Sequence, residues 1–257
     1  TVNLDSVPFD KMKQFIKDGY QRGGVITLSW HAQSPFGKPK GAWDITPGSV
    51  ASILPGGSNH ALYLHWLDRV ADFISALKGE KNEAIPILFR PFHELTGNWF
   101  WWCANVCTVD EYKTLWTFTR QYLQEQKSLH NLIWVYNTAG DFNTEQEYLE
   151  RYPGDDLVDM ISFDTYQHGD PAKGKEFAEK TEKRLALIGN IAEKKSKLFA
   201  LAETGYEQVP VANWWTETLL HAIGSNKISY VLLWRNHGYH ADMKKMHYYA
   251  PFKGQVS

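Results

Sequence analysis

A short apolar run that ends abruptly in charged and aromatic residues constrains the fold more than any other stretch. Residues 85–102 read IPILFRPFHELTGNWFWW, so the apolar run is followed at once by Arg90, His93 and Glu94. The run is too apolar to alternate between a buried and an exposed face, which is typical of a strand covered on both faces. Parallel sheets contain such strands, and their chemistry sits just past the carboxyl ends. Glu94 is therefore the first candidate for a catalytic residue.

The rest of the chain alternates between strand-like and helix-like segments. Short apolar runs predict six strands, at residues 25–30, 85–90, 131–137, 158–166, 197–206 and 228–236. Apolar residues at helical spacing predict helices over 8–24, 63–77, 108–123, 144–152, 175–195 and 211–223. Thr108 and Glu111 have the spacing of a capping box. The stretch from 31 to 59 is rich in Gly, Pro and Ser and is predicted to be a long loop.

This alternation predicts one parallel sheet, either an open doubly wound sheet or a (β/α)8 TIM barrel. No internal repeat or linker divides the chain, so we expect a single domain over residues 1–257. Polar or aromatic side chains follow every predicted strand: His31, His93 with Glu94, Asn137, Asp164 with Tyr166, Glu203, and Trp234 with Arg235. A barrel would bring all of these ends to one rim, whereas an open sheet would concentrate function at its switch point. The pattern favours the barrel.

Charge and short motifs exclude several classes of function. A net charge of −2 offers no basic stripe for nucleic acid or a membrane surface, and no apolar stretch is long enough to span a bilayer. HELTG has Gly97 where a zinc protease needs its second histidine. GDPAKGKE has Glu176 where a phosphate loop needs Ser or Thr, and neither a serine elbow nor a dinucleotide fingerprint occurs. We expect neither a metal nor a cofactor.

The aromatic and sulfur residues gather near the opening stretch. The chain has 11 Trp, 13 Tyr and 13 Phe, of which we expect a minority to face a flat, amphipathic ligand and most, such as Trp116 and Trp134, to lie in the core. Cys103 and Cys107 lack the second cysteine pair or nearby histidines of a structural zinc site. Free thiols and a small local disulfide both remain open.

Two glutamates, Glu94 and Glu203, stand immediately after apolar strand runs that lie far apart in the sequence. In a barrel they would face one another, which is the arrangement that glycoside hydrolysis requires. One carboxylic acid protonates the departing oxygen while a second carboxylate attacks the anomeric carbon. The alternative for each is a strand-end carboxylate paired with an arginine such as Arg90 or Arg235. Histidine, tyrosine and tryptophan at the same strand ends favour the catalytic interpretation.

The segments FRPFHELTGNWFWW, LSWH, SFDTY, LAETGY and LLWRN together resemble the β-mannanases of glycoside hydrolase family 26. The resemblance spans essentially the whole chain and implies a (β/α)8 barrel, retention of configuration, Glu94 as acid/base and Glu203 as nucleophile. It also implies that Tyr166 orients the nucleophile by donating a hydrogen bond and that the tryptophans are sugar platforms. The remaining residues with implied supporting or substrate-binding roles are His31, His93, Trp99, Asp164, Trp234 and Arg235.

The resemblance further implies a substrate class. Mannan, galactomannan or glucomannan is expected, with mixed-linkage β-glucan or β-1,3-xylan as alternatives and an inactive polysaccharide-binding barrel as the alternative of another class. Such a substrate implies a secreted or periplasmic protein, which we expect to be a monomer. The charge of Glu203 and burial should raise the pKa of Glu94, which must be protonated at rest. Cys103 stands where the family usually has Gly, so we expect at most a changed subsite shape.

The number of strands leads to one more expectation. A (β/α)8 barrel needs eight strands, whereas the sequence predicts six and opens with a helix. We therefore expect the first two strands to be missing from this chain, which would be a piece of a longer polypeptide that lacks an N-terminal βαβ portion of roughly 60 residues or more. The strand before Glu94 would then be the fourth of the barrel and the strand bearing Glu203 the seventh.

Overall fold

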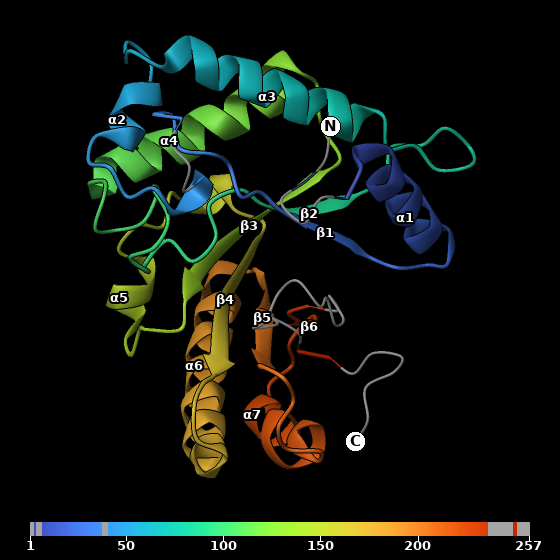
Figure 1. The fold of residues 1–257 in the computed structure, drawn as a ribbon, viewed down its shortest axis with the longest axis vertical. Coiled ribbons are helices and arrows are strands. Elements are labelled where there is room, and N and C mark those ends of the chain that lie inside the picture. The colour runs from blue at the N-terminus through green and yellow to red at the C-terminus, as the bar shows by residue number, and fades with distance from the viewer. Residues whose placement is uncertain (1–2, 4–6, 38–40, 236–248, 251–257) are drawn as a thin grey trace. The chain divides into compact units, whose positions relative to one another are not determined.

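The computed structural model describes residues 3, 7–37, 41–235 and 249–250. Within them the residue contacts define two compact units, which are described separately: residues 1–136 with 150–159, and residues 137–149 with 160–257. The expected single domain over residues 1–257 stays a prediction. The chain is an α/β protein in which the strand order is β1-β2-β3-β4-β5-β6, and strand β3 (Leu132–Ala139) passes through both units (Figure 1).

The first unit contains strands β1 (Ile26–Ser29) and β2 (Ile87–Arg90) and most of β3. β1 pairs in parallel with β2, and β2 pairs in parallel with β3. Every residue of β2 is buried, including Arg90, as the uninterrupted apolar run predicts for a strand covered on both faces. The helices of this unit are α1 (Phe9–Gln21), α2 (Ser49–Ile53), α3 (His60–Ser75) and α4 (Val109–Gln121).

Helix α4 begins where the sequence predicts. The side chain of Thr108 accepts a hydrogen bond from the backbone N–H of Glu111, and the side chain of Glu111 accepts one from the backbone N–H of Thr108. This reciprocal pair satisfies two N–H groups that a helix start leaves without intrahelical partners. α4 is tied to α3 by a 2.6 Å hydrogen bond between the hydroxyls of Tyr63 and Thr119.

The core of this unit is aromatic. Trp116 lies edge-on to Trp134, with ring centroids 6.0 Å apart, and Phe92 packs against Trp116 and Tyr112. Trp116 and Trp134 are each 1% exposed, which confirms that they are core residues.

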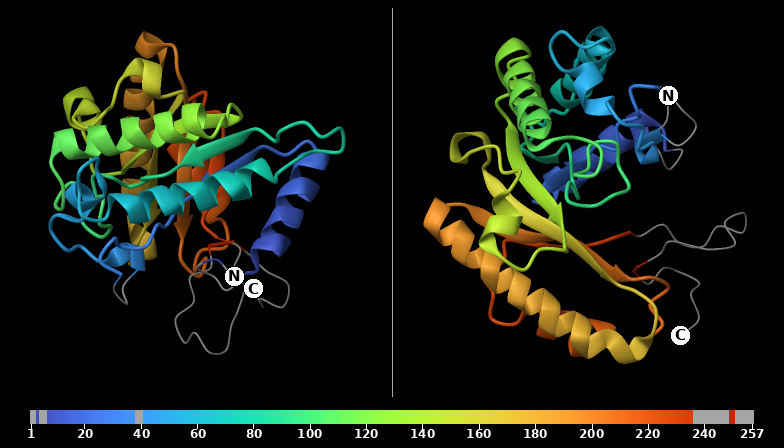
Figure 2. Two further views of the ribbon diagram at one scale, coloured as in Figure 1. Left: turned by 90° about the horizontal axis from the view of Figure 1, so that it is seen from above. Right: turned by 90° about the vertical axis from the view of Figure 1, so that its left-hand side faces the viewer.

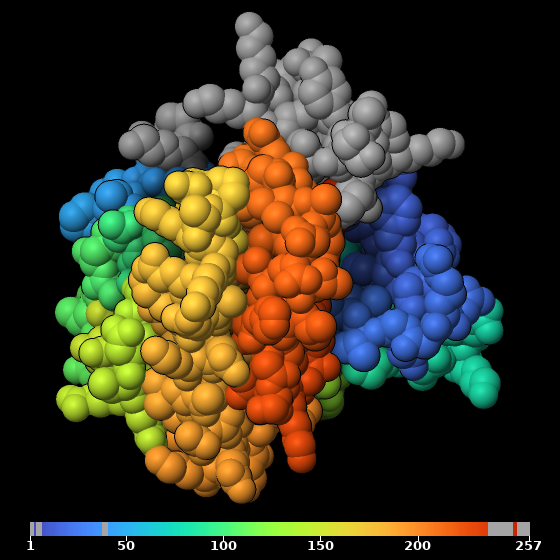
Figure 3. Space-filling view, turned by 90° about the horizontal axis from the view of Figure 1, so that it is seen from below, coloured from blue at the N-terminus to red at the C-terminus, as the bar shows by residue number. Residues whose placement is uncertain are grey.

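The second unit contains strands β4 (Met160–Gln167), β5 (Leu198–Tyr206) and β6 (Val231–Leu233), which pair in parallel. Its helices are α5 (Glu145–Leu149), α6 (Gly174–Lys195) and α7 (Leu220–Ile223), the last following a π-helical turn, Trp215–Leu219. α6 runs alongside β4 and β5 (Figure 2) and packs beside α7 on the surface (Figure 3). Its inner side buries Leu185, Ile188 and Ile191.

The described residues confirm the parallel α/β sheet and the positions of the six strands, with differences of a few residues at their ends. The last residue of the sixth predicted strand, Asn236, lies outside the described residues. Several short elements were missed, among them the 3-10 helices Asp155–Leu157 and Pro171–Lys173. The predicted loop over residues 31–59 contains a 3-10 helix, Gly41–Trp43, and α2, which are too short to show a helical period. The closed eight-stranded barrel stays a prediction. No helix of the described part combines the length and apolar character needed to cross a bilayer.

Candidate active site

In the first unit, the loop that follows β2 carries several of the polar side chains that the sequence predicts as site residues. This loop, residues 91–107, carries His93, Glu94 and Trp99. Glu94 is half-buried with a left-handed backbone (φ 53°), a conformation that non-glycine residues adopt rarely and mostly at constrained sites. The indole N–H of Trp99 donates a 2.6 Å hydrogen bond to Oε2 of Glu94. One oxygen of the candidate acid is thereby held by a residue of its own loop.

Two histidines from different strand ends meet beside this loop. The Nε2 atoms of His31, which follows β1, and His93, which follows β2, lie 3.2 Å apart. His93 is 2% exposed. Burial lowers the pKa of His93 well below its usual value, and the nearby His31 and Arg90 lower it further. A neutral His93 can donate from one ring nitrogen and accept at the other.

Aromatic rings pack against the histidine pair. Trp43 stacks on His31, with ring centroids 5.6 Å apart, and is 41% exposed, while Trp99 is 37% exposed. Phe100 is buried and contacts both histidines and Trp43. Sequence analysis missed Trp43 as a site residue. The available signal was an isolated tryptophan in a polar loop that starts at a strand end.

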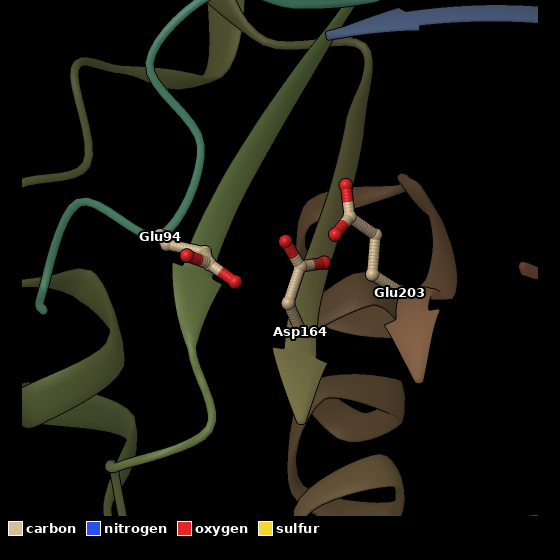
Figure 4. Close-up of side chains that lie close together, drawn as sticks. All are labelled: Glu94, Asp164 and Glu203. Atoms are coloured by element: carbon tan, nitrogen blue, oxygen red, sulfur yellow. The ribbon is translucent and has the colours of Figure 1, made fainter. Parts of the chain in front are cut away.

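The second unit brings together Asp164, Tyr166 and Glu203 at the carboxyl ends of β4 and β5. Figure 4 shows the side chains of Asp164 and Glu203 on these neighbouring strands, and their carboxylate oxygens lie within 4.8 Å of one another. The register explains this proximity. Phe163 pairs with Leu201, but Asp164 pairs with Glu203, so Ala202 is the extra residue of a bulge in β5. A bulge re-aims the side chains that follow it, and here it aligns the two carboxylates.

Both carboxylates are buried and receive hydrogen bonds. The hydroxyl of Tyr166 donates a 2.6 Å hydrogen bond to Oε2 of Glu203, as the sequence resemblance implied. The amide of Asn137 donates to Oδ1 of Asp164 and to Oγ of Ser162, both at 2.9 Å. Glu203 and Asp164 are each 3% exposed. Buried carboxylates need such donors, because desolvation without them is costly.

A further tyrosine, Tyr249, packs against Tyr166. The ring of Tyr249 lies 5.4 Å from that of Tyr166, centroid to centroid, and its backbone N–H donates to the carbonyl of Arg235. Gly205 leaves the space for it, because a Cβ there would fall 2.6 Å from the Tyr249 ring. Sequence analysis missed Tyr249, since it lies in a C-terminal stretch with no strand or helix signal. Trp234 and Arg235 follow β6, where the Arg235 guanidinium lies 5.6 Å from the Trp234 ring centroid.

The model of glycosyl hydrolase family 26 matches residues 5–243, which is most of the chain. The chain belongs to glycosyl hydrolase family 26. Among family 26 structures, a β-mannanase from Bacteroides ovatus is 43% identical and superposes with a TM-score of 0.91, over 99% of this chain and 72% of that one.

Curated relatives carry two kinds of name. A mannan endo-1,4-beta-mannosidase of Bifidobacterium adolescentis is 36% identical over 197 residues, which is 76% of this chain and 19% of the relative. An Endoglucanase H of Acetivibrio thermocellus is 32% identical over 168 residues, which is 64% of this chain and 16% of the relative. This family 26 chain therefore spans less than a fifth of either protein.

The family 26 loop holds both cysteines as free, buried thiols, so the local disulfide that the sequence left open does not occur. Cys103 lies closer to the candidate acid than expected. Its Sγ lies 3.4 Å from the backbone carbonyl oxygen of Glu94 and donates a hydrogen bond to it. The departure from the usual family residue therefore touches the backbone of Glu94.

Proposed function

We propose that this chain is the catalytic part of a retaining endo-β-1,4-mannanase, with Glu203 as nucleophile and Glu94 as acid/base. The observation that carries the proposal is the hydrogen bond from Tyr166 to Glu203. A donor on one oxygen fixes the orientation of the carboxylate that attacks the anomeric carbon. The nearby carboxylate of Asp164 is itself held by Asn137. On this assignment Asp164 orients the substrate or its neighbours and forms no bond to the sugar.

Glu94 supplies the proton in this scheme. Its Oε2 accepts from the Trp99 indole, which fixes the orientation of the carboxyl group that protonates the leaving group. Attack by Glu203 breaks the glycosidic bond and forms a glycosyl-enzyme, while the proton of Glu94 passes to the departing hydroxyl. The charge of Glu203 is then lost. Glu94, now ionised, takes a proton from water, which attacks the anomeric carbon and restores Glu203 with overall retention.

This mechanism requires the two glutamates to face one another across the bond that is cut. We propose that the six parallel strands are part of a (β/α)8 barrel, which would bring the ends of β2 and β5 to one rim. The half-buried strands at the two ends of the strand order, β1 and β6, support this proposal. In a complex with a substrate analogue we expect the carboxyl groups of Glu94 and Glu203 to lie about 5 to 5.5 Å apart. A crystal structure with a separation of about 9 Å would instead indicate inversion.

The remaining roles concern sugar recognition. His31 and His93 hydrogen-bond the sugar beside the scissile bond, and Trp99 and Trp234 form platforms for sugar rings. Arg235 completes the rim beside Trp234. Aromatic faces suit sugars because the rings of a pyranoside present C–H groups on their faces and hydroxyls at their edges.

Mannan is the proposed substrate because it is named in the Bifidobacterium relative and the Bacteroides structure is a β-mannanase. The endoglucanase relative supports β-glucan as a second candidate. β-1,3-xylan is a third candidate substrate, and a barrel that binds polysaccharide without hydrolysing it is the candidate of another class. A polysaccharide substrate implies that the protein acts outside the cytoplasm, as a secreted or periplasmic enzyme, and we propose that it acts as a monomer.

A reducing-sugar assay on galactomannan, glucomannan, lichenan and 1,3-xylan tests activity and substrate class together. Release from the two mannans supports the mannanase, release from lichenan alone supports the glucanase, and release from 1,3-xylan alone supports the xylanase. Binding of a polysaccharide without release from any of the four would leave only the binding barrel. NMR of the first product formed then tests the stereochemistry, since a retaining enzyme releases the β-anomer first.

A further inference from the structure

The loop that carries Glu94 is fixed by a row of hydrogen bonds to its backbone. Four successive carbonyl groups, from Phe92 to Leu95, each accept a hydrogen bond from a later residue of the same unit. Tyr112 donates its hydroxyl to Phe92 at 3.4 Å, and Trp102 donates its indole N–H to His93 at 2.8 Å. Buried carbonyls that are all satisfied in this way leave a loop little freedom to rearrange.

The next two carbonyls, of Glu94 and Leu95, accept hydrogen bonds from the residues that follow Trp102. The Glu94 carbonyl accepts from the Gly97 N–H at 2.9 Å and from the Cys103 thiol at 3.4 Å, and the Ala104 N–H donates to the Leu95 carbonyl at 2.8 Å. Residues 102, 103 and 104 thus bind residues 93, 94 and 95 in order. Burial raises the pKa of the Cys103 thiol to about 12, so the sulfur keeps the proton that it donates.

Arg151 binds the backbone at the C-terminal end of this row of hydrogen bonds. It is 6% exposed and lies in the segment that follows α5, yet its guanidinium reaches back to the loop. Nη1 donates to the carbonyl of Thr108 at 3.0 Å and to Sγ of Cys107 at 3.7 Å, and Nη2 donates to the carbonyl of Ala104 at 3.3 Å. A buried guanidinium that binds two carbonyls sets the distance between them, because its donors have a fixed geometry.

We propose that Cys103 and Arg151 are positioning residues for Glu94, acting through the backbone of residues 93–108. The inference rests on the proposed role of Glu94 as acid/base. Arg151 binds the carbonyl of Ala104, and the N–H of Ala104 binds the carbonyl of Leu95. The thiol of Cys103 binds the carbonyl of Glu94 itself. These hydrogen bonds hold the left-handed backbone of Glu94 in place. A general acid works only when its proton points at the leaving oxygen, and small displacements of a catalytic group are costly.

The test compares substrates whose leaving groups differ in their need for a proton. In the full protein, Cys103→Ala removes the thiol donor and leaves the Gly97 N–H as a donor to the Glu94 carbonyl, whereas Cys103→Ser keeps a side-chain donor. We expect Cys103→Ala to lower kcat/KM about tenfold on a mannooligosaccharide while that on a dinitrophenyl glycoside stays within about twofold. Cys103→Ser should retain most of the activity on both substrates.

Arg151→Met and Arg151→Lys test the other end of this row of hydrogen bonds. We expect the same selective loss on the mannooligosaccharide, larger for Met, which cannot donate a hydrogen bond. Arg184→Met is the matched control, since Arg184 also donates to a backbone carbonyl, that of Phe142 in the second unit. If Arg151→Met does not fold, as judged by circular dichroism, the Lys and Cys103 variants carry the test.

Glu94→Ala separates failure of the inference from failure of the proposed function. If Glu94→Ala lowers kcat/KM equally on both substrates, or lowers it on neither, Glu94 is not the acid and the proposed function fails. A second outcome is that Glu94→Ala shows the selective loss, but the Cys103 and Arg151 variants lower kcat/KM equally on both substrates or on neither. In that case these residues do not position the acid, and the inference is overturned.

Discussion

The hydroxyl of Tyr166 lies 2.6 Å from Oε2 of Glu203 and donates a hydrogen bond to it, linking the ends of β4 and β5. Tyr166→Phe removes only this donor. We expect kcat to fall by about 10² or more, because such a donor to a reacting carboxylate is lost without change of shape. Tyr206→Phe is the matched control, since the Tyr206 hydroxyl donates to the carbonyl of Gly169. An unchanged kcat in Tyr166→Phe would show that the bond does not serve the reaction.

The two glutamates should differ in how their loss depends on the substrate. Glu203→Ala should abolish turnover of every substrate, because no nucleophile remains to form the glycosyl-enzyme. Glu94→Ala should be least harmful toward activated aryl glycosides, whose leaving group departs without a proton. Steady-state kinetics on mannan and on an aryl glycoside measures both effects. An aryl glycoside that survives Glu203→Ala would mean that the roles are reversed or wrong.

The pKa of His93 is lowered by burial, so the folded protein keeps this ring neutral where the unfolded chain takes up a proton. The unfolded state therefore binds more protons as pH falls below about 6.5, and stability falls with it, by at most about 1.4 kcal/mol per pH unit from this group. Urea unfolding between about pH 5 and 8 measures the slope. His93→Gln should flatten it, whereas substitution of the exposed His221 by Gln should not. Equal slopes for the original protein and His93→Gln would contradict the prediction.

Both thiols should be unreactive in the folded protein. Burial raises the pKa of Cys103 to about 12 and that of Cys107 to about 11, and only the thiolate is a good nucleophile. We expect a thiol reagent at pH 8 to label neither cysteine until denaturant is added, when both react at the rate of a free thiol. Mass spectrometry of the labelled chain assigns each site. Rapid labelling of either residue under native conditions would mean that its burial is incomplete.

The strands and the residues at their ends were predictable because both depend on local patterns. Apolar runs such as the one before Arg90 mark buried strands, and a polar residue that follows one marks the functional edge of a parallel sheet. The hydrogen bond between Tyr166 and Glu203 was predictable only through the family resemblance, since no local rule joins two strands. The capping box at Thr108 was predictable because its two partners are three residues apart.

What the sequence did not predict depends on tertiary contacts. The bulge at Ala202 aligns Glu203 with Asp164, but nothing in the run LFALAETGY marks one residue as extra. Arg151 carries no motif, and its contacts with Ala104 and Thr108 depend on where the segment after α5 packs. The position of Tyr249 also could not be predicted from the sequence, because its packing beside Tyr166 depends on the space left by Gly205.

The position of Tyr249 has a consequence for how the protein is made. Domains generally begin to fold from the N-terminal side while the chain is still being synthesised. The donors from Tyr112, Trp102, Cys103, Ala104 and Arg151 to the backbone of the Glu94 loop are all present once Arg151 has left the ribosome, so the surroundings of Glu94 can assemble early. The packing around Tyr166 is complete only after Tyr249 has emerged. The surroundings of the candidate acid can thus form before those of the candidate nucleophile.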